Sequence, residues 1–170
     1  MDDFSIESHP FTPVLPPHAR VMMMGTFPPA AAKRCMAFHY PNFQNDMWRI
    51  YGLVFFNDAG HFQVAGEKRF DAGKIRDFLM AHNIALCPTV RRAVRERGNA
   101  SDKFLRIVEP VDLGAVLAQL PDCRWLFTTG GKATETLLSL LEPAPPMPPV
   151  NQAVAFDYHG RHLQLCRLPS

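Results

Sequence analysis

The sequence lacks the cysteine spacing that would mark a metal site. Its four cysteines are Cys35, Cys87, Cys123 and Cys166, and no two of them form a C-x-x-C pair. Zinc and iron–sulfur sites in proteins depend on such close pairs of thiolates. We therefore expect no metal and no other cofactor, and we expect the four thiols to stay reduced.

Long apolar runs are also missing. No window of the sequence approaches the roughly 20 apolar residues that a membrane helix needs. The first residues, MDDFSIESHPF, carry acidic side chains and lack the continuous apolar core of a signal peptide. These absences favour a cytoplasmic protein without a membrane partner.

The sequence also lacks a large excess of charge of either sign. The formal net charge is +2, with 20% charged and 47% hydrophobic residues, which is typical of a globular protein. A chain of 170 residues is long enough for one domain, residues 1–170, with a sizeable core. The balance neither demands nor excludes a nucleic-acid partner, because a local patch would suffice.

One basic segment stands out against this balance. Residues 84–108 hold six basic and only two acidic side chains. The basic ones are Arg91, Arg92, Arg95, Arg97, Lys103 and Arg106. The segment is either a solvated helix face or a surface that binds phosphates.

The most informative stretch is residues 21–56, which begins with an apolar run that ends at Gly25. A continuous apolar run predicts a buried parallel strand, and glycine permits a sharp exit from it. Ligands bind outside the carboxyl ends of such strands. We therefore expect Tyr40, Asn42, Asn45 and Trp48, which follow soon after, to lie near a pocket rim.

Apolar periodicity predicts alternating strands and helices along the rest of the chain. Strands are expected at residues 20–25, 84–87, 104–108 and 124–128, and helices at 46–54, 71–82, 91–97, 113–120 and 133–141. Residues 154–157 and 163–168 form either a hairpin or a last core strand. Residues 1–19 are expected to be an extended arm and the proline-rich residues 142–149 a stiff linker. The alternation predicts a three-layer α/β/α sandwich around a mainly parallel sheet of about four strands.

Three features invite a functional interpretation and also have a purely structural one. The turn at residues 129–132, Thr-Gly-Gly-Lys, precedes a helix start that would attract an anion, but a tight turn needs glycines in any case. Asn45 can hold a water or read a base edge, and it also stands where a helix N-cap is expected. The aromatic side chains around it can stack on a base or simply fill the core.

These segments resemble the uracil-DNA glycosylase superfamily, and most closely its mismatch-specific uracil and hypoxanthine-DNA glycosylase branches. The likeness lies in GTFPP at residues 25–29, FHYP at 38–41, NDMW at 45–48, TTGGKA at 128–133 and RLPS at 167–170. The resemblance implies a monomeric enzyme that hydrolyses the N-glycosidic bond of a deaminated base, uracil or hypoxanthine, in DNA. It also implies that the base is extruded from the stack.

Site roles follow from the resemblance residue by residue. Many branches place an Asp or Asn at the position of Phe27 to hold the attacking water; in the hypoxanthine-type branch that role belongs to the residue matching Asn45. Base contacts are then expected from Gly25, Thr26, Phe27, Pro28, Phe38, Tyr40, Trp48 and Phe56. Together with the basic segment, phosphate contacts are expected from Arg91, Arg92, Arg95, Gly130, Gly131, Lys132, Pro169 and Ser170.

Two departures from the superfamily pattern keep other functions open. Phe27 cannot hold a water, and the Pro-Ser loop, which usually continues, reaches only Ser170, with Leu168 in the place of a His. We expect this loop to leave the cleft open on one side. The alternatives are a nucleic-acid-binding module of the same fold without activity, and a nucleoside or nucleotide hydrolase.

Overall fold

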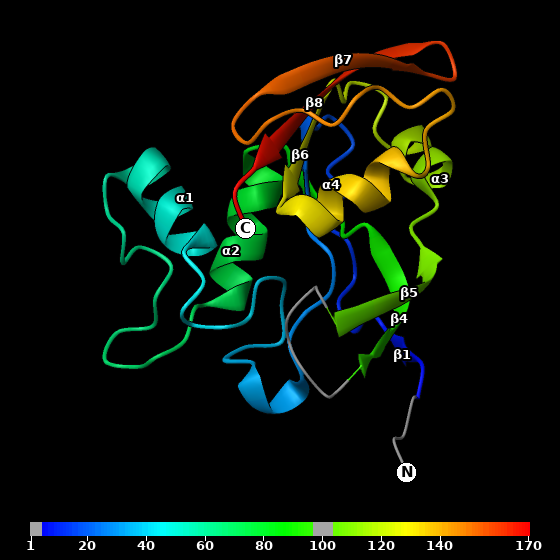
Figure 1. The fold of residues 1–170 in the computed structure, drawn as a ribbon. Coiled ribbons are helices and arrows are strands. Elements are labelled where there is room, and N and C mark those ends of the chain that lie inside the picture. The colour runs from blue at the N-terminus through cyan, green and yellow to red at the C-terminus, as the bar shows by residue number, and fades with distance from the viewer. Residues whose placement is uncertain (1–4, 97–103) are drawn as a thin grey trace.

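The computed structural model describes residues 5–96 and 104–170, and its elements form two sheets flanked by helices (Figure 1). No helix in this described part of the chain is long and apolar enough to span a membrane. The strands are β1 (Glu7–Ser8), β2 (Val21–Met24), β3 (Ile84–Leu86), β4 (Val90–Arg95), β5 (Leu105–Pro110), β6 (Trp125–Thr129), β7 (Ala153–Tyr158) and β8 (Arg161–Leu168). The helices are the 3₁₀ turn η1 (Ala31–Lys33), α1 (Met47–Phe56), α2 (Ala72–Ala81), α3 (Leu113–Ala118) and α4 (Gly131–Leu138).

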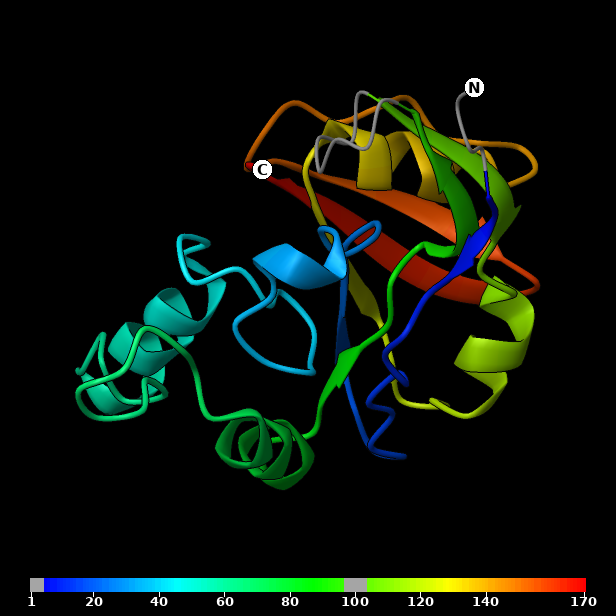
Figure 2. The ribbon, with the colours of Figure 1, turned by 90° about the horizontal axis from the view of Figure 1, so that it is seen from below.

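The larger sheet has five strands in the order β3-β2-β6-β8-β7. The first four run parallel, and β7 pairs antiparallel with β8. The parallel strands therefore end at the same edge of the sheet, which Figure 2 views from below. This confirms the predicted α/β class. The sheet has one strand more than expected, because the C-terminal segment supplies both a hairpin and a core strand.

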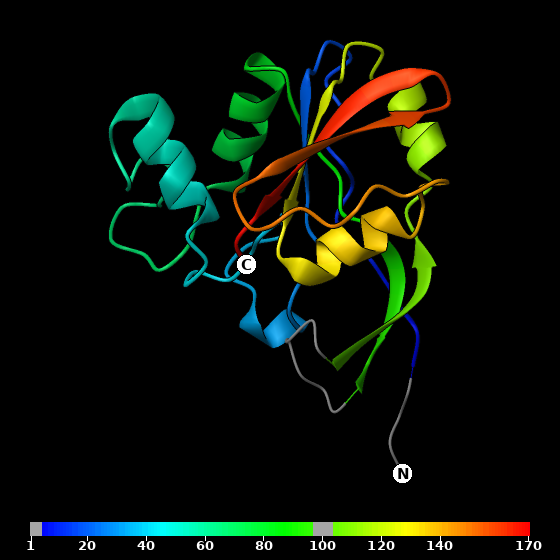
Figure 3. The same cartoon turned by 45° about the horizontal axis from the view of Figure 1, so that its top comes forward.

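Helices cover both faces of this sheet (Figure 3). The alternation of strand side chains decides which residues meet which helices. Met22 and Met24 of β2 pack into the cluster with α3 and α4, whereas Met23 packs on the other face with α1 and α2. Two separate cores result, one in each interface between sheet and helices.

Local capping explains where two of the helices begin. The Asp71 side chain accepts a hydrogen bond from the backbone N of Lys74 at 3.1 Å, and Asp112 does the same for Ala115 at 3.1 Å. Such caps stabilise a helix start by about 1 kcal/mol. The first of these helices was predicted from its apolar stripe and the second from Asp112 as its cap, and both are confirmed.

The helix predicted over residues 91–97 is wrong. Residues 90–95 form β4, which lies between β1 and β5 in the small antiparallel sheet. Register shifts beside Arg92 mark a β-bulge, and a bulge breaks the two-residue alternation of a strand. Val90, Ala93 and Val94 are consequently buried at a spacing that imitates a helix. Arg97, Gly98 and Lys103 lie outside the described residues.

The strand expected at residues 104–108 exists as β5, but it belongs to the small sheet rather than to the main one. The N-terminal segment connects the two sheets. Its β1 pairs with β4, and further along Val14 exchanges backbone hydrogen bonds of 2.9 and 2.8 Å with Leu86 of β3. The segment thereby covers the edge of the main sheet and passes close to the strand ends.

Candidate active site

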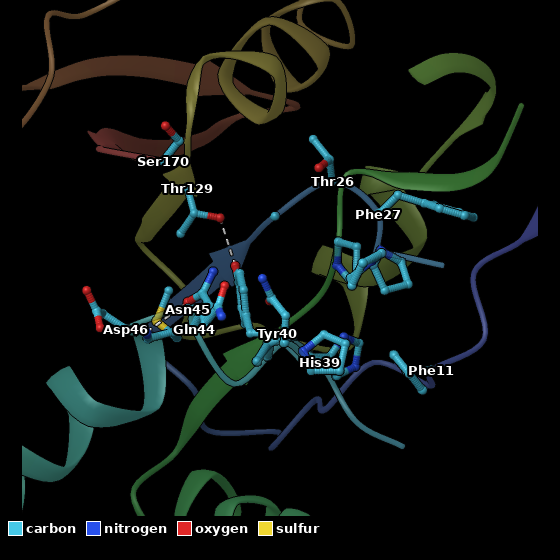
Figure 4. Close-up of a pocket in the computed structure, with 18 of the residues that line it drawn as sticks. Phe11, Thr26, Phe27, His39, Tyr40, Gln44, Asn45, Asp46, Thr129 and Ser170 are labelled. Carbon is cyan, nitrogen blue, oxygen red and sulfur yellow. Dashed lines mark hydrogen bonds between the residues drawn. The ribbon is translucent and has the colours of Figure 1, made fainter. Parts of the chain in front are cut away.

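A pocket of about 610 Å³ opens at the edge where the parallel strands end. Its walls come from segments that follow four different strands: residues 25–29 after β2, Pro88 after β3, Thr129 at the end of β6, and Ser170 after β8. The loop before α1 and the N-terminal segment close the remaining sides (Figure 4). Ligand pockets of α/β sheets typically form at this edge.

Gly25 is required by a close approach inside this pocket. A Cβ atom at this position would lie 2.9 Å from the Tyr40 hydroxyl and 3.2 Å from Oγ1 of Thr129. The carbonyl of Gly25 also accepts hydrogen bonds from the backbone N and the hydroxyl of Thr89, at 2.8 and 2.9 Å. The turn after β2 is therefore fixed on both sides.

Asn45 lies in the pocket and also caps α1. Its Oδ1 accepts a hydrogen bond from the backbone N of Met47 at 2.8 Å, while the side chain of Asp46, at the N-cap position itself, makes no cap bond. An amide oxygen has two acceptor sites. Oδ1 can therefore hold the helix start and still accept one hydrogen from a water molecule.

Three aromatic residues that the sequence assigned to the base lie outside the residues that line the pocket. Phe38 and Trp48 are 3% and 0% exposed and belong to the core beneath the loop. Trp48 donates from Nε1 to the carbonyl of His39 at 3.0 Å, so it supports the loop from below. Phe56, at the C-terminal end of α1, stacks on His61 with the two ring centres 3.7 Å apart. Of the aromatic side chains expected to contact the base, only Tyr40 and Phe27 line the pocket.

Phe27 lines the pocket but packs against the small sheet, with Val90 and Leu105. The guanidinium of Arg95 lies 5.4 Å from the centre of its ring. Arg95 also pairs with Glu7 at 2.9 Å and donates to the carbonyl of Pro28. With its side chain only 7% exposed, Arg95 holds the turn in place and has little access to a DNA phosphate.

The other two arginines of β4 are exposed to solvent. Arg92 forms an ion pair with Glu109, with Nε and Oε2 2.7 Å apart. Arg91 has no carboxylate partner among the residues that the structure describes. Of the three arginines expected to bind phosphate, Arg91 is the one whose charge is most available.

The turn between β6 and α4 and the chain end border the pocket together. Gly130, at φ +97°, donates from its backbone N to the carbonyl of Leu168 at 3.1 Å, and a Cβ there would lie 3.1 Å from Cβ of Ser170. Thr134 donates from its hydroxyl to the carbonyl of Gly130 at 2.9 Å. The two predicted phosphate-binding segments, residues 130–132 and 169–170, are thus adjacent.

Two histidines that the sequence left unassigned also line the pocket. His9 and His39 have ring centres 5.4 Å apart. Burial lowers the pKa of His9 to about 3, with a further contribution from His39, and burial lowers that of His39 to about 4. Both rings are therefore neutral at pH 7. No sequence motif links them, because the path of the N-terminal segment brings them together.

Asp46 is the one carboxylate among the described residues that line the pocket. It lies on the pocket rim, 3.6 Å from Nη1 of Arg49, with its side chain 74% exposed. In the described part of the chain, no group of three or more His, Cys, Asp or Glu side chains is placed to hold a metal ion. The polar groups available for chemistry are thus amides, hydroxyls, neutral imidazoles and this carboxylate.

Comparison with known proteins finds a solved structure with a similar fold. Neither a protein-family model nor a curated protein sequence matches the chain. The chain is similar to the solution NMR structure of a putative uracil DNA glycosylase from Methanosarcina acetivorans, with a TM-score of 0.66 and 21% sequence identity. The similarity covers 98% of this chain and 84% of the other. It shows that the two chains share one α/β fold.

Proposed function

We propose that this protein is a monofunctional DNA glycosylase that hydrolyses the N-glycosidic bond of a deaminated base, uracil or hypoxanthine. One observation carries the proposal: Asn45, the turn at residues 25–28 and Ser170 line a single pocket at the strand ends. The shared fold with the Methanosarcina acetivorans protein supports the same class of reaction. The proposal places the chain in the uracil-DNA glycosylase superfamily, on the mismatch-specific or hypoxanthine-type branch.

The size of the pocket suits one extruded base. Pockets for small molecules commonly enclose about 300–1,000 Å³, and this one encloses about 610 Å³. A base inside a duplex cannot be reached, so the enzyme must take it out of the stack. In the pocket, the turn at residues 25–28 forms one wall and Tyr40 offers a ring to the base.

Asn45 would position the water that attacks the sugar. Its Oδ1 accepts a hydrogen from the water, whose oxygen then forms a bond to C1′ of the deoxyribose. The bond from C1′ to the base nitrogen breaks, its electron pair leaves with the base, and the proton of the water passes to solvent. The transition state resembles an oxocarbenium ion.

An amide is a poor proton acceptor, which decides what this site can contribute. Catalysis would rest on orientation of the water and on the electrostatic environment of the leaving base. Turnover should therefore be slow. The exposed Asp46 on the rim is too well solvated to replace a buried carboxylate as base.

DNA phosphates would be held along the border of the pocket. The backbone of residues 131 and 132 at the start of α4, together with Pro169 and Ser170, would form one contact region, next to Gly130, whose backbone N already donates to the carbonyl of Leu168. Arg91, which lines a neighbouring hollow rather than this pocket, would supply a solvent-exposed charge from β4. The protein would bind DNA as a monomer.

A second candidate is a nucleic-acid-binding module of the same fold that lacks glycosylase activity. The observation that favours it is Phe27, whose apolar ring is held between His9 and Arg95 where other branches place a water-holding side chain. The two candidates make opposite predictions for bond cleavage and the same prediction for DNA binding.

A panel of oligonucleotides, each with one altered base, tests the proposal. Excess enzyme is incubated with each duplex, abasic sites are cleaved with alkali, and the strand products are quantified. We expect cleavage at uracil or hypoxanthine and none at unmodified bases. DNA binding without any cleavage would favour the module, and equal cleavage of free deoxyinosine would favour a nucleoside hydrolase.

A further inference from the structure

His9 and His39 stand side by side in the pocket, and the chemistry proposed above uses neither. His9 follows β1, and His39 belongs to the loop that leads to α1. The planes of the two imidazole rings are inclined by 33° to each other. The ring of Phe11 contacts both edge-on, with its centre 5.8 Å from that of His9 and 5.7 Å from that of His39. Figure 4 shows His39 next to Tyr40 on the pocket wall.

Backbone partners fix the position of the proton on each ring. The backbone N of Phe11 lies 3.1 Å from Nδ1 of His9, and an amide N–H can only donate. Nδ1 of His9 is therefore bare, and Nε2 carries the hydrogen of the neutral ring. The carbonyl of Thr12 lies 2.9 Å from Nε2 of His39 and can only accept, so His39 has its hydrogen on Nε2 and a bare Nδ1.

The two remaining nitrogens have opposite polarity. Nε2 of His9 is a donor and Nδ1 of His39 is an acceptor, and neither has a hydrogen-bond partner within residues 5–96 and 104–170. The amides of Asn42 and Gln44, which also line the pocket, can rotate to offer either polarity. The histidine pair cannot, because the N-terminal segment holds both tautomers.

We propose, on the basis of the function proposed above, that His9 and His39 read the O=C–N–H edge of the extruded base. His9 donates from Nε2 to the exocyclic oxygen, and His39 accepts at Nδ1 from the neighbouring ring N–H. Uracil and hypoxanthine both present this edge. The pair is thus a specificity device that the N-terminal segment builds into the pocket.

The same pair rejects the parent bases of these lesions. Cytosine and adenine present an amino group and a bare ring nitrogen in the corresponding places. Donor would then meet donor and acceptor would meet acceptor, and a site with unpaired polar groups rejects such a ligand strongly. Guanine and thymine carry the accepted edge, so their rejection depends on the space around the 2-amino and 5-methyl groups.

Two substitutions separate base reading from support of the loop. His9→Asn keeps an oxygen for the backbone N of Phe11 but removes the donor at the Nε2 position. His39→Gln keeps a donor for the carbonyl of Thr12 but removes the acceptor at the Nδ1 position. His82→Gln, at the end of α2 and outside the pocket, is the matched control.

The test compares duplexes that carry hypoxanthine with duplexes that carry unsubstituted purine, which lacks both the oxygen and the ring N–H. Single-turnover excision is measured for each. Binding is measured in parallel on duplexes that carry the 2′-fluoro nucleotides of the same two bases. The fluorine destabilises an oxocarbenium-like transition state and thereby prevents cleavage. Thermal unfolding of each variant confirms that it is folded.

We expect the wild-type protein to prefer hypoxanthine over purine in both measurements. Each variant should reduce that preference by about tenfold or more, which corresponds to the loss of one hydrogen bond to the base. The His82→Gln control should keep it. An unchanged preference in both His9→Asn and His39→Gln would overturn the proposal, and so would a wild-type protein that binds the two bases equally.

The binding measurement separates this proposal from the glycosylase proposal. Selective binding of the hypoxanthine duplex without excision would contradict the glycosylase and support the histidine pair. Excision that does not depend on the two histidines would support the glycosylase and contradict the proposed role of the histidine pair.

Discussion

The hydroxyl of Tyr40 lies 2.8 Å from Oγ1 of Thr129, and this hydrogen bond joins the loop before α1 to the end of β6. Tyr40 has a positive φ of 51°, which is unfavourable for a bulky residue. Its ring rests edge-on against Trp48 at 5.9 Å. Packing from below and the hydrogen bond from the side therefore hold Tyr40 across the pocket.

Gly25→Ala should disrupt this arrangement. The new Cβ would lie 2.9 Å from the Tyr40 hydroxyl, so the hydroxyl must move away from Thr129. We expect a loss of about 1–3 kcal/mol in the free energy of unfolding. Gly73→Ala is the matched control, because a Cβ there meets nothing closer than 3.6 Å and alanine favours α2.

Chemical denaturation of four proteins tests the cause of this loss. Tyr40→Phe removes the atom that the new Cβ would strike, so the cost of Gly25→Ala should fall in that background. A coupling energy of at least about 0.5 kcal/mol is expected. Strictly additive effects would show that Gly25 is required for another reason.

The neutral histidine pair predicts a loss of stability in mild acid. Burial holds the pKa of His9 at about 3 and that of His39 at about 4, whereas an unfolded histidine titrates near about 6.5. Between about pH 6.5 and 4 the unfolded chain therefore binds protons that the folded protein does not. Stability is fully present above pH 6.5 and falls as the pH is lowered, by up to about 1.4 kcal/mol per pH unit for each histidine.

Denaturation of the wild-type protein and the His9→Asn, His39→Gln double variant at several pH values checks this. The double variant should lose less stability between pH 6.5 and 4. Parallel curves for the two proteins would contradict the neutral state of the pair.

The arginines of β4 should differ in how they affect DNA binding. Arg91 is exposed, so Arg91→Ala should reduce the log–log salt slope of DNA affinity by about 0.9 for a single phosphate contact. Arg95→Ala should leave that slope nearly unchanged and instead destabilise the protein, because Arg95 is buried against Phe27 and pairs with Glu7. Equal slopes for Arg91→Ala and the wild-type protein would remove Arg91 from the interface.

The sequence predicted best those features that depend on neighbouring residues. The helices begun by Asp71 and Asp112 were expected because a cap and an apolar stripe are both local signals. The strand ending at Gly25 was likewise visible as an apolar run. The alternation of these elements was enough to predict the α/β class.

Features that depend on distant parts of the chain were missed. The bulge in β4 lies in its pairing with the distant strand β5. The arginines of this segment were instead predicted to form a short basic helix that ends at Gly98. The pairing of His9 with His39 depends on the path of the N-terminal segment: His9 donates from its backbone N to the carbonyl of Arg91 at 2.7 Å, and the carbonyl of Thr12 accepts from His39 at 2.9 Å. No local pattern encodes these contacts. Trp48 and Phe38 were expected to contact the nucleobase, but in the fold both are buried beneath the loop and support it.

The cap role of Asn45 must be separated from its proposed catalytic role before any variant is interpreted. Asn45→Ala removes both the cap of α1 and the water acceptor, whereas Asp112→Ala removes a comparable cap at a residue that does not line the pocket. Each should cost about 1 kcal/mol of stability. Any additional effect of Asn45→Ala on excision then belongs to the reaction.

Single-turnover excision of uracil or hypoxanthine by Asn45→Ala tests the central claim most directly, with enzyme in excess and DNA affinity measured on the same duplex. Loss of the positioned water raises the barrier without weakening binding. We predict that the rate falls by about 10²-fold or more, with little change in affinity, and that Asp112→Ala keeps the wild-type rate. Excision by Asn45→Ala at the wild-type rate, in a protein as stable as Asp112→Ala, would contradict the account.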